Sequence, residues 1–109
     1  MSEDRRKHPR YPVKMPVTVA RGGEALSVLV RDISCEAVFV VARDPFPVGT
    51  LVTVTFGLPG KDGPLRVGGR VVRVVESASG GEPGMAIRFN VLSGADQVRL
   101  DFFIALQAG

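Results

Sequence analysis

Three arginines near the start of the chain have the type and spacing suited to gripping an anionic, planar ligand. Arg6 and Arg10 form an R-x-x-x-R pair, and Arg5 comes directly before it. A guanidinium group pairs bidentately with phosphate, stacks on bases and forks onto O6 and N7 of guanine, so arginine is the best single side chain for a guanine nucleotide. Taken alone, however, the cluster is also typical of a solvated basic tail.

A second pair of polar residues, Asp32 and Ser34, stands at the end of a segment with strand-like alternation. A carboxylate accepts hydrogen bonds from the N1 and N2 donors of guanine, while a serine hydroxyl either contacts a phosphate oxygen or stiffens a turn. Both are ordinary turn residues as well. The pair becomes informative only in combination with the arginines one hairpin earlier in the chain.

Residues that could carry out catalysis or hold a metal lack the companions that such chemistry needs. His8 is the only histidine, with no H-x-H, H-E-x-x-H or carboxylate cluster around it, and Cys35 is the only cysteine. A single thiol forms neither an intrachain disulfide nor a cysteine-based zinc site, and no structured base is available to activate it. The glycine-containing loops lack the order of a phosphate-binding P-loop. We therefore expect a binding module that is not an enzyme and holds no metal or cofactor.

The composition fits one small domain with a packed core. The chain has 109 residues, of which 45% are hydrophobic and 23% are charged, close to average globular usage. The N-terminus has no apolar signal segment, and the longest apolar run, Val38 to Ala42, is far too short to span a membrane. The cytoplasm is therefore the expected compartment.

The elements that must position these residues are predicted to be strands. Pro9 and Pro12 disfavour a helix in residues 1–12, which we expect to form a flexible arm in front of a domain over residues 13–109. Gly68 and Gly69 interrupt the longest strand and suggest a bulge or a close approach by another chain or a ligand. The expected strands are Pro16–Arg21, Leu26–Arg31, Val38–Val41, Leu51–Leu58, Leu65–Val75 and Met85–Phe89.

One helix is predicted at the end of the chain. Ser93 can cap it, and Asp96 lies three residues later as a short variant of the capping box. The residues expected to pack on the strands, across an open end, are Ala95, Val98, Phe102 and Leu106, with Phe103 and Ile104 widening the stripe. Short antiparallel strands followed by one helix indicate an all-β fold, either a small barrel or a sandwich.

At this point the sequence resembles the PilZ family, the bacterial receptor domains for the second messenger cyclic di-GMP. The family pattern is R-x-x-x-R followed by [DN]-x-S-x-x-G, which this chain matches at Arg6, Arg10, Asp32 and Ser34. Residues 69–74, residues 84–89 and the terminal helix extend the likeness over nearly the whole chain. The resemblance implies a six-stranded antiparallel β-barrel with a C-terminal α-helix, in which the arm folds over one face and clamps the dinucleotide.

The resemblance also implies a set of ligand-contacting residues: Arg5, Arg6, Arg10, Asp32, Ser34, Ala37, Gly69 and Arg70. The arginines of the arm would contact guanine and phosphate, Asp32 a guanine edge, and Ser34 the phosphate side. Ordering of the arm by cyclic di-GMP would create a surface for an unidentified protein partner, as in control of motility or biofilm formation. The protein would be a monomer or a ligand-linked dimer, with no specific nucleic acid and no membrane as a partner.

Ala37 departs from the family pattern, which has glycine there. If that glycine serves a left-handed backbone, alanine costs about 1 to 2 kcal/mol; if it makes room for the ligand, the methyl group clashes. Ala37 motivates a second hypothesis, a degenerate PilZ adaptor that acts by protein contact alone. A third, a nucleic-acid-binding barrel, is motivated by an isoelectric point of about 9.6, although few aromatic residues are available to stack on bases.

Overall fold

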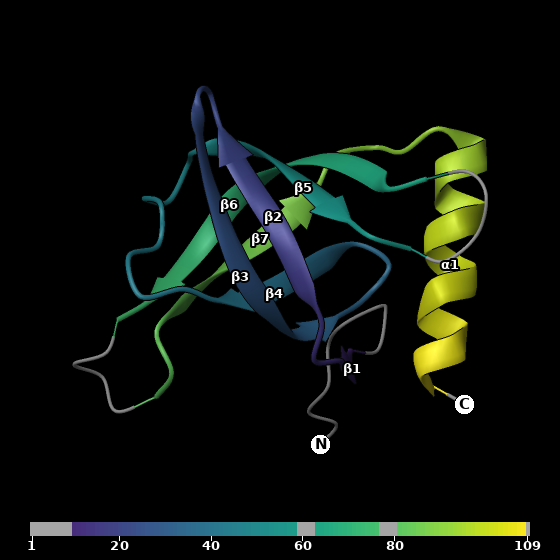
Figure 1. Ribbon diagram of the computed structural model, residues 1–109, viewed down its shortest axis with the longest axis horizontal. Coiled ribbons are helices and arrows are strands. Elements are labelled where there is room, and N and C mark those ends of the chain that lie inside the picture. Colours follow the sequence, from purple (N-terminus) through teal and green to yellow (C-terminus); the bar gives the residue numbers. More distant parts are fainter. Residues whose placement is uncertain (1–9, 59–62, 77–80, 109) are drawn as a thin grey trace, which may run out of the picture.

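Alternating apolar and polar residues fold this chain into antiparallel strands whose apolar sides share one interior (Figure 1). The computed structural model describes residues 10–58, 63–76 and 81–108, with the side chains up to residue 106. The strands are β1 (Tyr11–Pro12), β2 (Pro16–Arg21), β3 (Glu24–Ile33), β4 (Ala37–Val41), β5 (Leu51–Phe56), β6 (Leu65–Val75) and β7 (Gly84–Phe89), and the helix is α1 (Gly94–Ala108).

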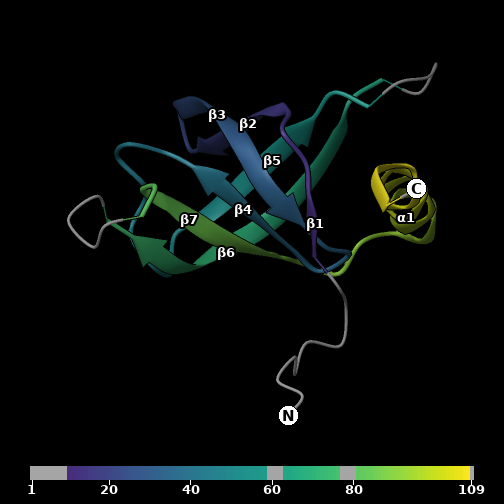
Figure 2. The same cartoon turned by 90° about the horizontal axis from the view of Figure 1, so that it is seen from below.

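The strands close into a barrel. Their order is β1-β3-β2-β5-β6-β7-β4, and every pairing is antiparallel. A further pairing joins β4, at one end of the sheet, to β3, which lies next to β1 at the other end. Six long strands make up the barrel wall, which confirms the predicted fold and decides between barrel and sandwich. The additional strand, β1, has only two residues and lies beside β3 (Figure 2).

Two β-bulges decide which polar side chains face outward. β3 is irregular between Val30 and Asp32, and β6 between Val71 and Arg73. A bulge inserts one extra residue, so two successive side chains face outward where regular alternation would have turned one of them inward. Asp32 therefore lies on the outer face next to Arg31, whereas Val30 and Ile33 on either side are buried.

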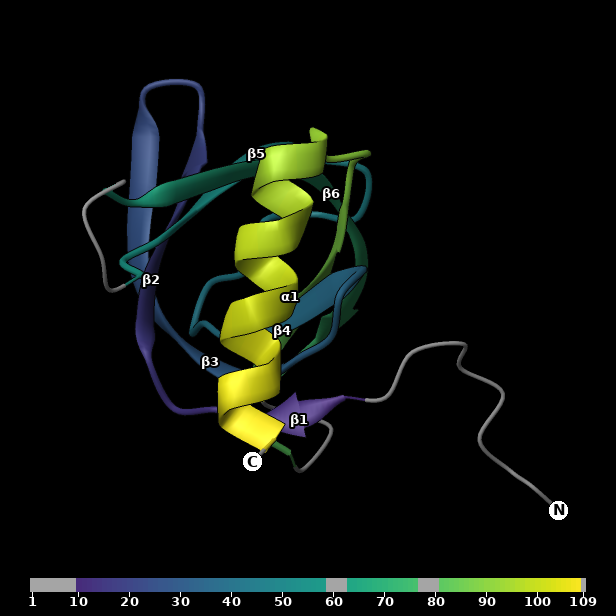
Figure 3. The same cartoon turned by 90° about the vertical axis from the view of Figure 1, so that its right-hand side faces the viewer.

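The helix α1 runs across one end of the barrel, as predicted (Figure 3). Its cap is the predicted one, because the Ser93 Oγ accepts a hydrogen bond from the Asp96 N–H at 3.2 Å. The predicted packing face was wrong in part. Phe103 and Ile104 are buried together with Leu100, but the rest of the expected stripe faces solvent: Ala95, Val98, Phe102 and Leu106.

The reason for this error is that α1 carries two apolar stripes. Leu100, Phe103 and Ile104 also follow helical spacing, and a helix can turn only one of two such stripes toward the barrel. The stripe with Val98 and Phe102 remains 67% and 65% exposed at those residues. Within the described residues, no helix is long and apolar enough to cross a membrane.

Candidate ligand-binding site

The candidate site lies on the outer face of the barrel, where a row of side chains crosses four strands. Asp32 of β3 pairs with Phe39 of β4, Phe39 pairs with Ala86 of β7, and Ala86 pairs with Arg73 of β6. Directly paired residues of an antiparallel sheet share a face. We call Asp32, Phe39, Ala86 and Arg73 the clamp row.

Arg10 reaches this row because β1 holds the end of the arm against β3. Tyr11 pairs with Ile33, Pro12 pairs with Asp32, and the Val13 N–H donates to the Arg31 carbonyl at 3.2 Å. The Arg10 guanidinium then donates to Asp32 Oδ1 at 2.9 Å, across a separation of 22 residues. The structure thus brings together Arg10 and Asp32, one residue from each of the two predicted motifs.

Asp32 is held from both sides. Arg31 Nε donates to its second oxygen, Oδ2, at 2.9 Å, while Arg10 occupies Oδ1. The Asp32 side chain is only 17% exposed, so these charge-assisted hydrogen bonds are partly shielded from water. The carboxylate is therefore fixed in place, yet its oxygens keep lone pairs for further donors.

The Phe39 ring packs beneath two arginine side chains of the site. The ring is fully buried, although it lies on the outer face, because the Arg31 and Arg73 guanidinium groups lie 3.9 Å and 5.6 Å from its centroid. A Cβ atom at Gly84 would come within 2.7 Å of the ring at Cε1, so glycine is needed there for the ring to lie against β7. Cation–π contacts of this kind hold both guanidinium groups at the surface.

Together these residues line a hollow of about 600 Å³, formed by Arg10, Pro12, Arg31, Asp32 and Arg73. Three guanidinium groups against one carboxylate leave the hollow positively charged. It can therefore pair with phosphates, stack a guanidinium on a base, and offer carboxylate lone pairs to the donors of a guanine. Arg31, Arg73 and Phe39 were missed in the sequence. Only the position of Arg31 beside Asp32 could have indicated one of them.

Ser34 holds the turn between β3 and β4. Its hydroxyl oxygen accepts hydrogen bonds from the N–H groups of Ala37 at 3.2 Å and Glu36 at 3.3 Å, and the residue is 2% exposed. Of the two roles that its side chain type permits, the structure therefore shows the stiffening of the turn. A contact between Ser34 and a ligand phosphate stays a prediction.

Ala37 adopts a backbone conformation that is open to any residue. Within the described ranges, the residues with positive φ are all glycines, namely Gly22, Gly49 and Gly63. Ala37 therefore causes no left-handed strain in the backbone of this chain. Ala37 is 6% exposed and pairs with Arg88, in the row next to the clamp row.

The other predicted contact residues lie in different places. A Cβ atom at Gly69 would come within 2.6 Å of the Arg88 carbonyl oxygen and 2.8 Å of Ile87 Cγ2, so Gly69 allows β6 and β7 to approach closely. The close approach that this glycine suggested is thus to the neighbouring strand, and the bulge lies further along β6, between Val71 and Arg73. Arg70 is exposed but does not line the hollow. Arg5, Arg6 and His8 lie outside the described residues.

Cys35 and the acidic side chains of the described residues are not grouped with the partners that catalysis or metal binding needs. Burial raises the pKa of the Cys35 thiol, and the nearby charges of Asp101 and Glu36 raise it further, so the thiol stays protonated at neutral pH. Among residues 10–58, 63–76 and 81–108, no three His, Cys, Asp or Glu side chains are grouped to hold a metal ion.

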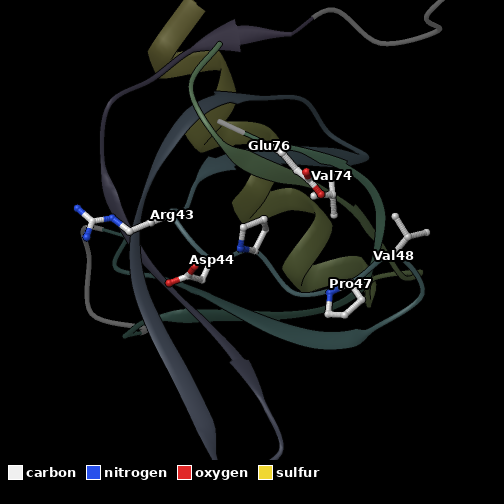
Figure 4. A pocket seen from close by; sticks show the side chains of 7 residues that line it. Arg43, Asp44, Pro47, Val48, Val74 and Glu76 are labelled. Carbon is white, nitrogen blue, oxygen red and sulfur yellow. The ribbon is translucent and has the colours of Figure 1, made fainter. Parts of the chain in front are cut away.

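A second hollow, of about 690 Å³, lies on the side of the barrel away from α1 (Figure 4). Its lining contains one cation and two carboxylates, with prolines and valines between them: Arg43, Asp44, Pro45, Pro47, Val48, Val74 and Glu76. None of the predicted contact residues is among them. Its mixed charges give phosphate groups no net attraction, so we do not assign the ligand to it.

The fold and the site define a small β-barrel domain with an arginine-lined hollow on its outer face. The family model of the PilZ domain matches residues 4–106, so the chain belongs to the PilZ family. No protein with a curated description matches the sequence.

Solved structures of PilZ proteins share the fold at low identity. The inhibitor of motility MotI/DgrA from Bacillus subtilis has 21% identity and a TM-score of 0.77, over 96% of this chain and 52% of that one. The PilZ domain of Escherichia coli YcgR, solved with c-di-GMP, has 16% identity and a TM-score of 0.70, over 96% and 92%. The K. pneumonia MrkH complex with c-di-GMP has 16% identity and a TM-score of 0.71, over 94% and 51%. This chain thus spans about half the length of MotI and MrkH.

Proposed function

We propose that this protein is a cyclic di-GMP receptor without catalytic activity, which signals to a protein partner when the ligand is bound. The observation that carries the proposal is the ion pair between Arg10 and Asp32, at 2.9 Å, inside a hollow with three arginines. It joins the two motifs of the family on one face. The complexes of the YcgR PilZ domain and of MrkH with c-di-GMP support the same ligand.

The clamp row accounts for both parts of the ligand. Asp32 accepts hydrogen bonds from the guanine N1 and N2 donors, while its bonds to Arg10 and Arg31 keep the carboxylate oriented. Arg10 and Arg73 pair with the phosphates or stack on the bases, and Arg5 and Arg6 of the arm close over the ligand. Ser34 acts through the turn that it holds, and Arg70 lies at the edge of the site.

The signal follows from the place of the arm. β1 is held to β3 by only two residue pairs, and Arg10 is the charged residue that ties it to the clamp row. A ligand that adds contacts between the arm and the barrel shifts the arm toward its ordered position. The resulting surface is then available to the partner, which we expect in the cytoplasm.

A second function is favoured by one observation, the methyl group of Ala37 on the outer face beside Arg88. If that methyl blocks the ligand, the protein is an adaptor that acts by protein contact alone. Because the backbone at residue 37 is not left-handed, blocking of the ligand is the remaining reason for such a loss.

Titration calorimetry with cyclic di-GMP decides between the two functions. The receptor predicts saturable heat with a dissociation constant in the micromolar range or tighter. Absence of heat at high micromolar ligand, in a protein whose circular dichroism shows a folded barrel, refutes the receptor and leaves the adaptor.

A further inference from the structure

A second row of side chains crosses the same outer face, next to the clamp row. Ala37 of β4 pairs with Arg88 of β7, Arg88 pairs with Arg70 of β6, and Arg70 pairs with Leu51 of β5. We call Ala37, Arg88, Arg70 and Leu51 the arginine row. No residue of this row lines the hollow beside Asp32.

The arginine row contains two like charges that destabilise the sheet. Arg70 and Arg88 stand directly opposite each other, and like charges in that position destabilise a sheet. Arg88 is 67% exposed, and its nearest carboxylate, Glu36, is 3.7 Å away. Arg66 and Arg70 lie on the same strand, and within the described part of the chain neither side chain has a hydrogen bond or an ion pair. An unbalanced charge at such a place indicates an anion from outside.

Exposed aliphatic side chains adjoin these arginines. Leu51, directly opposite Arg70, is 63% exposed. Val72, which the bulge of β6 turns outward, is 46% exposed, and Val48 on the preceding loop is 60% exposed. Large apolar side chains gathered on a surface and bordered by charges are typical of protein interaction sites.

We propose that Arg66, Arg70, Arg88, Leu51 and Val72 form a docking surface for an acidic, amphipathic segment of a partner protein. Its carboxylates pair with the arginines, and its apolar side chains cover Leu51 and Val72. Nucleic acid fits this surface less well, because the exposed apolar residues of the surface are aliphatic and give bases no ring to stack on.

The docking surface deepens the proposed function, on which it rests for its meaning as an output, since it gives the partner a place beside the ligand. The charges and apolar residues themselves belong to the barrel and are present without the ligand. Binding of a partner segment and binding of cyclic di-GMP can therefore be measured separately.

The test is fluorescence anisotropy with the full chain, in the absence of cyclic di-GMP. The probes are a fluorescein-labelled amphipathic peptide of leucine and glutamate, the same peptide with glutamine for glutamate, a labelled single-stranded DNA, and vesicles containing phosphatidylserine. We expect Arg70→Glu to weaken the glutamate peptide by about tenfold and Leu51→Ser by about threefold. Arg43→Glu makes the same change of net charge at a residue that is not part of the docking surface, so it serves as the matched control and should change binding by less than about twofold.

The outcomes separate the explanations. Equal binding of the glutamine peptide, no effect of Leu51→Ser, or equal effects of Arg43→Glu and Arg70→Glu would overturn the proposal, as would tighter binding of DNA or vesicles with the same dependence on Arg70. Calorimetric titrations of the parent chain and of Leu51→Ser with cyclic di-GMP distinguish the two failures. If the peptide binds and cyclic di-GMP does not, the receptor is refuted and the docking surface stands; the reverse result refutes the docking surface alone.

Discussion

The clamp row and the arginine row lie side by side on one face of the barrel, but their arginines have different surroundings. In the clamp row, Asp32 binds both Arg10 and Arg31, and Phe39 lies beneath Arg31 and Arg73. In the arginine row, two like charges face each other across β6 and β7. The first arrangement is organised before any ligand arrives, which lowers the entropy lost on binding. In the second, Glu36 lies near Arg88 but the Arg70 side chain has no counter-charge, so this row is suited to a partner that brings one.

The largest expected effect is a loss of folding stability at Phe39 of the clamp row. Phe39→Ala removes a fully buried ring from beneath two guanidinium groups, and we expect the free energy of unfolding to fall by about 3 to 4 kcal/mol. Urea denaturation measures this loss. Phe102→Ala is the matched control, because that ring is 65% exposed and should cost less than about 1 kcal/mol. Similar losses in the two variants would contradict a supporting role for Phe39.

The next effect concerns the ligand. Arg10→Ala removes the arginine that joins the arm to Asp32, and hydrogen bonds to charged groups contribute about 1.5 to 3 kcal/mol. We expect the dissociation constant for cyclic di-GMP to rise by about 10- to 100-fold in calorimetry. Arg43→Ala, in the second hollow, should leave the dissociation constant unchanged. An unchanged affinity in Arg10→Ala would show that the clamp row is not the ligand site.

A smaller change is expected at Ala37, where the two rows adjoin. Because the backbone there is not left-handed, Ala37→Gly relieves no strain; it adds freedom to the unfolded chain and should lower the free energy of unfolding by about 0.5 to 1 kcal/mol. Thermal unfolding checks this sign. Under the receptor proposal the affinity for cyclic di-GMP changes little, whereas a large gain of affinity in Ala37→Gly would favour the adaptor.

The strands could be predicted from the sequence, but the surroundings of Asp32 could not. Alternation alone locates β2 and β5, and the spacing of two motifs indicates that Arg10 and Asp32 belong together. Arg31 and Arg73 reach Phe39 only through the register of four strands and through two bulges, each of which turns an additional residue outward. A shift by one residue reverses the face of every side chain that follows, so such neighbours are not visible in a linear pattern. The prediction of the packing face of α1 was wrong in part for a related reason. The helix carries two apolar stripes, and the linear sequence does not show which of them packs on the barrel.

The smallest expected effect is a gain in stability, and it tests the arginine row alone. Arg70→Glu replaces a pair of like charges by an opposite-charge pair with Arg88, so we expect the free energy of unfolding to rise by about 0.2 to 1 kcal/mol at low salt, and the gain to shrink as salt increases. Arg66→Glu, opposite Thr55, should give no such gain. If Arg70→Glu is less stable than the parent, or if Arg66→Glu is equally stabilised, the two arginines do not repel each other as inferred. A variant that is more stable and yet loses the acidic peptide would show that Arg70 lowers stability in exchange for binding, as residues of functional surfaces commonly do.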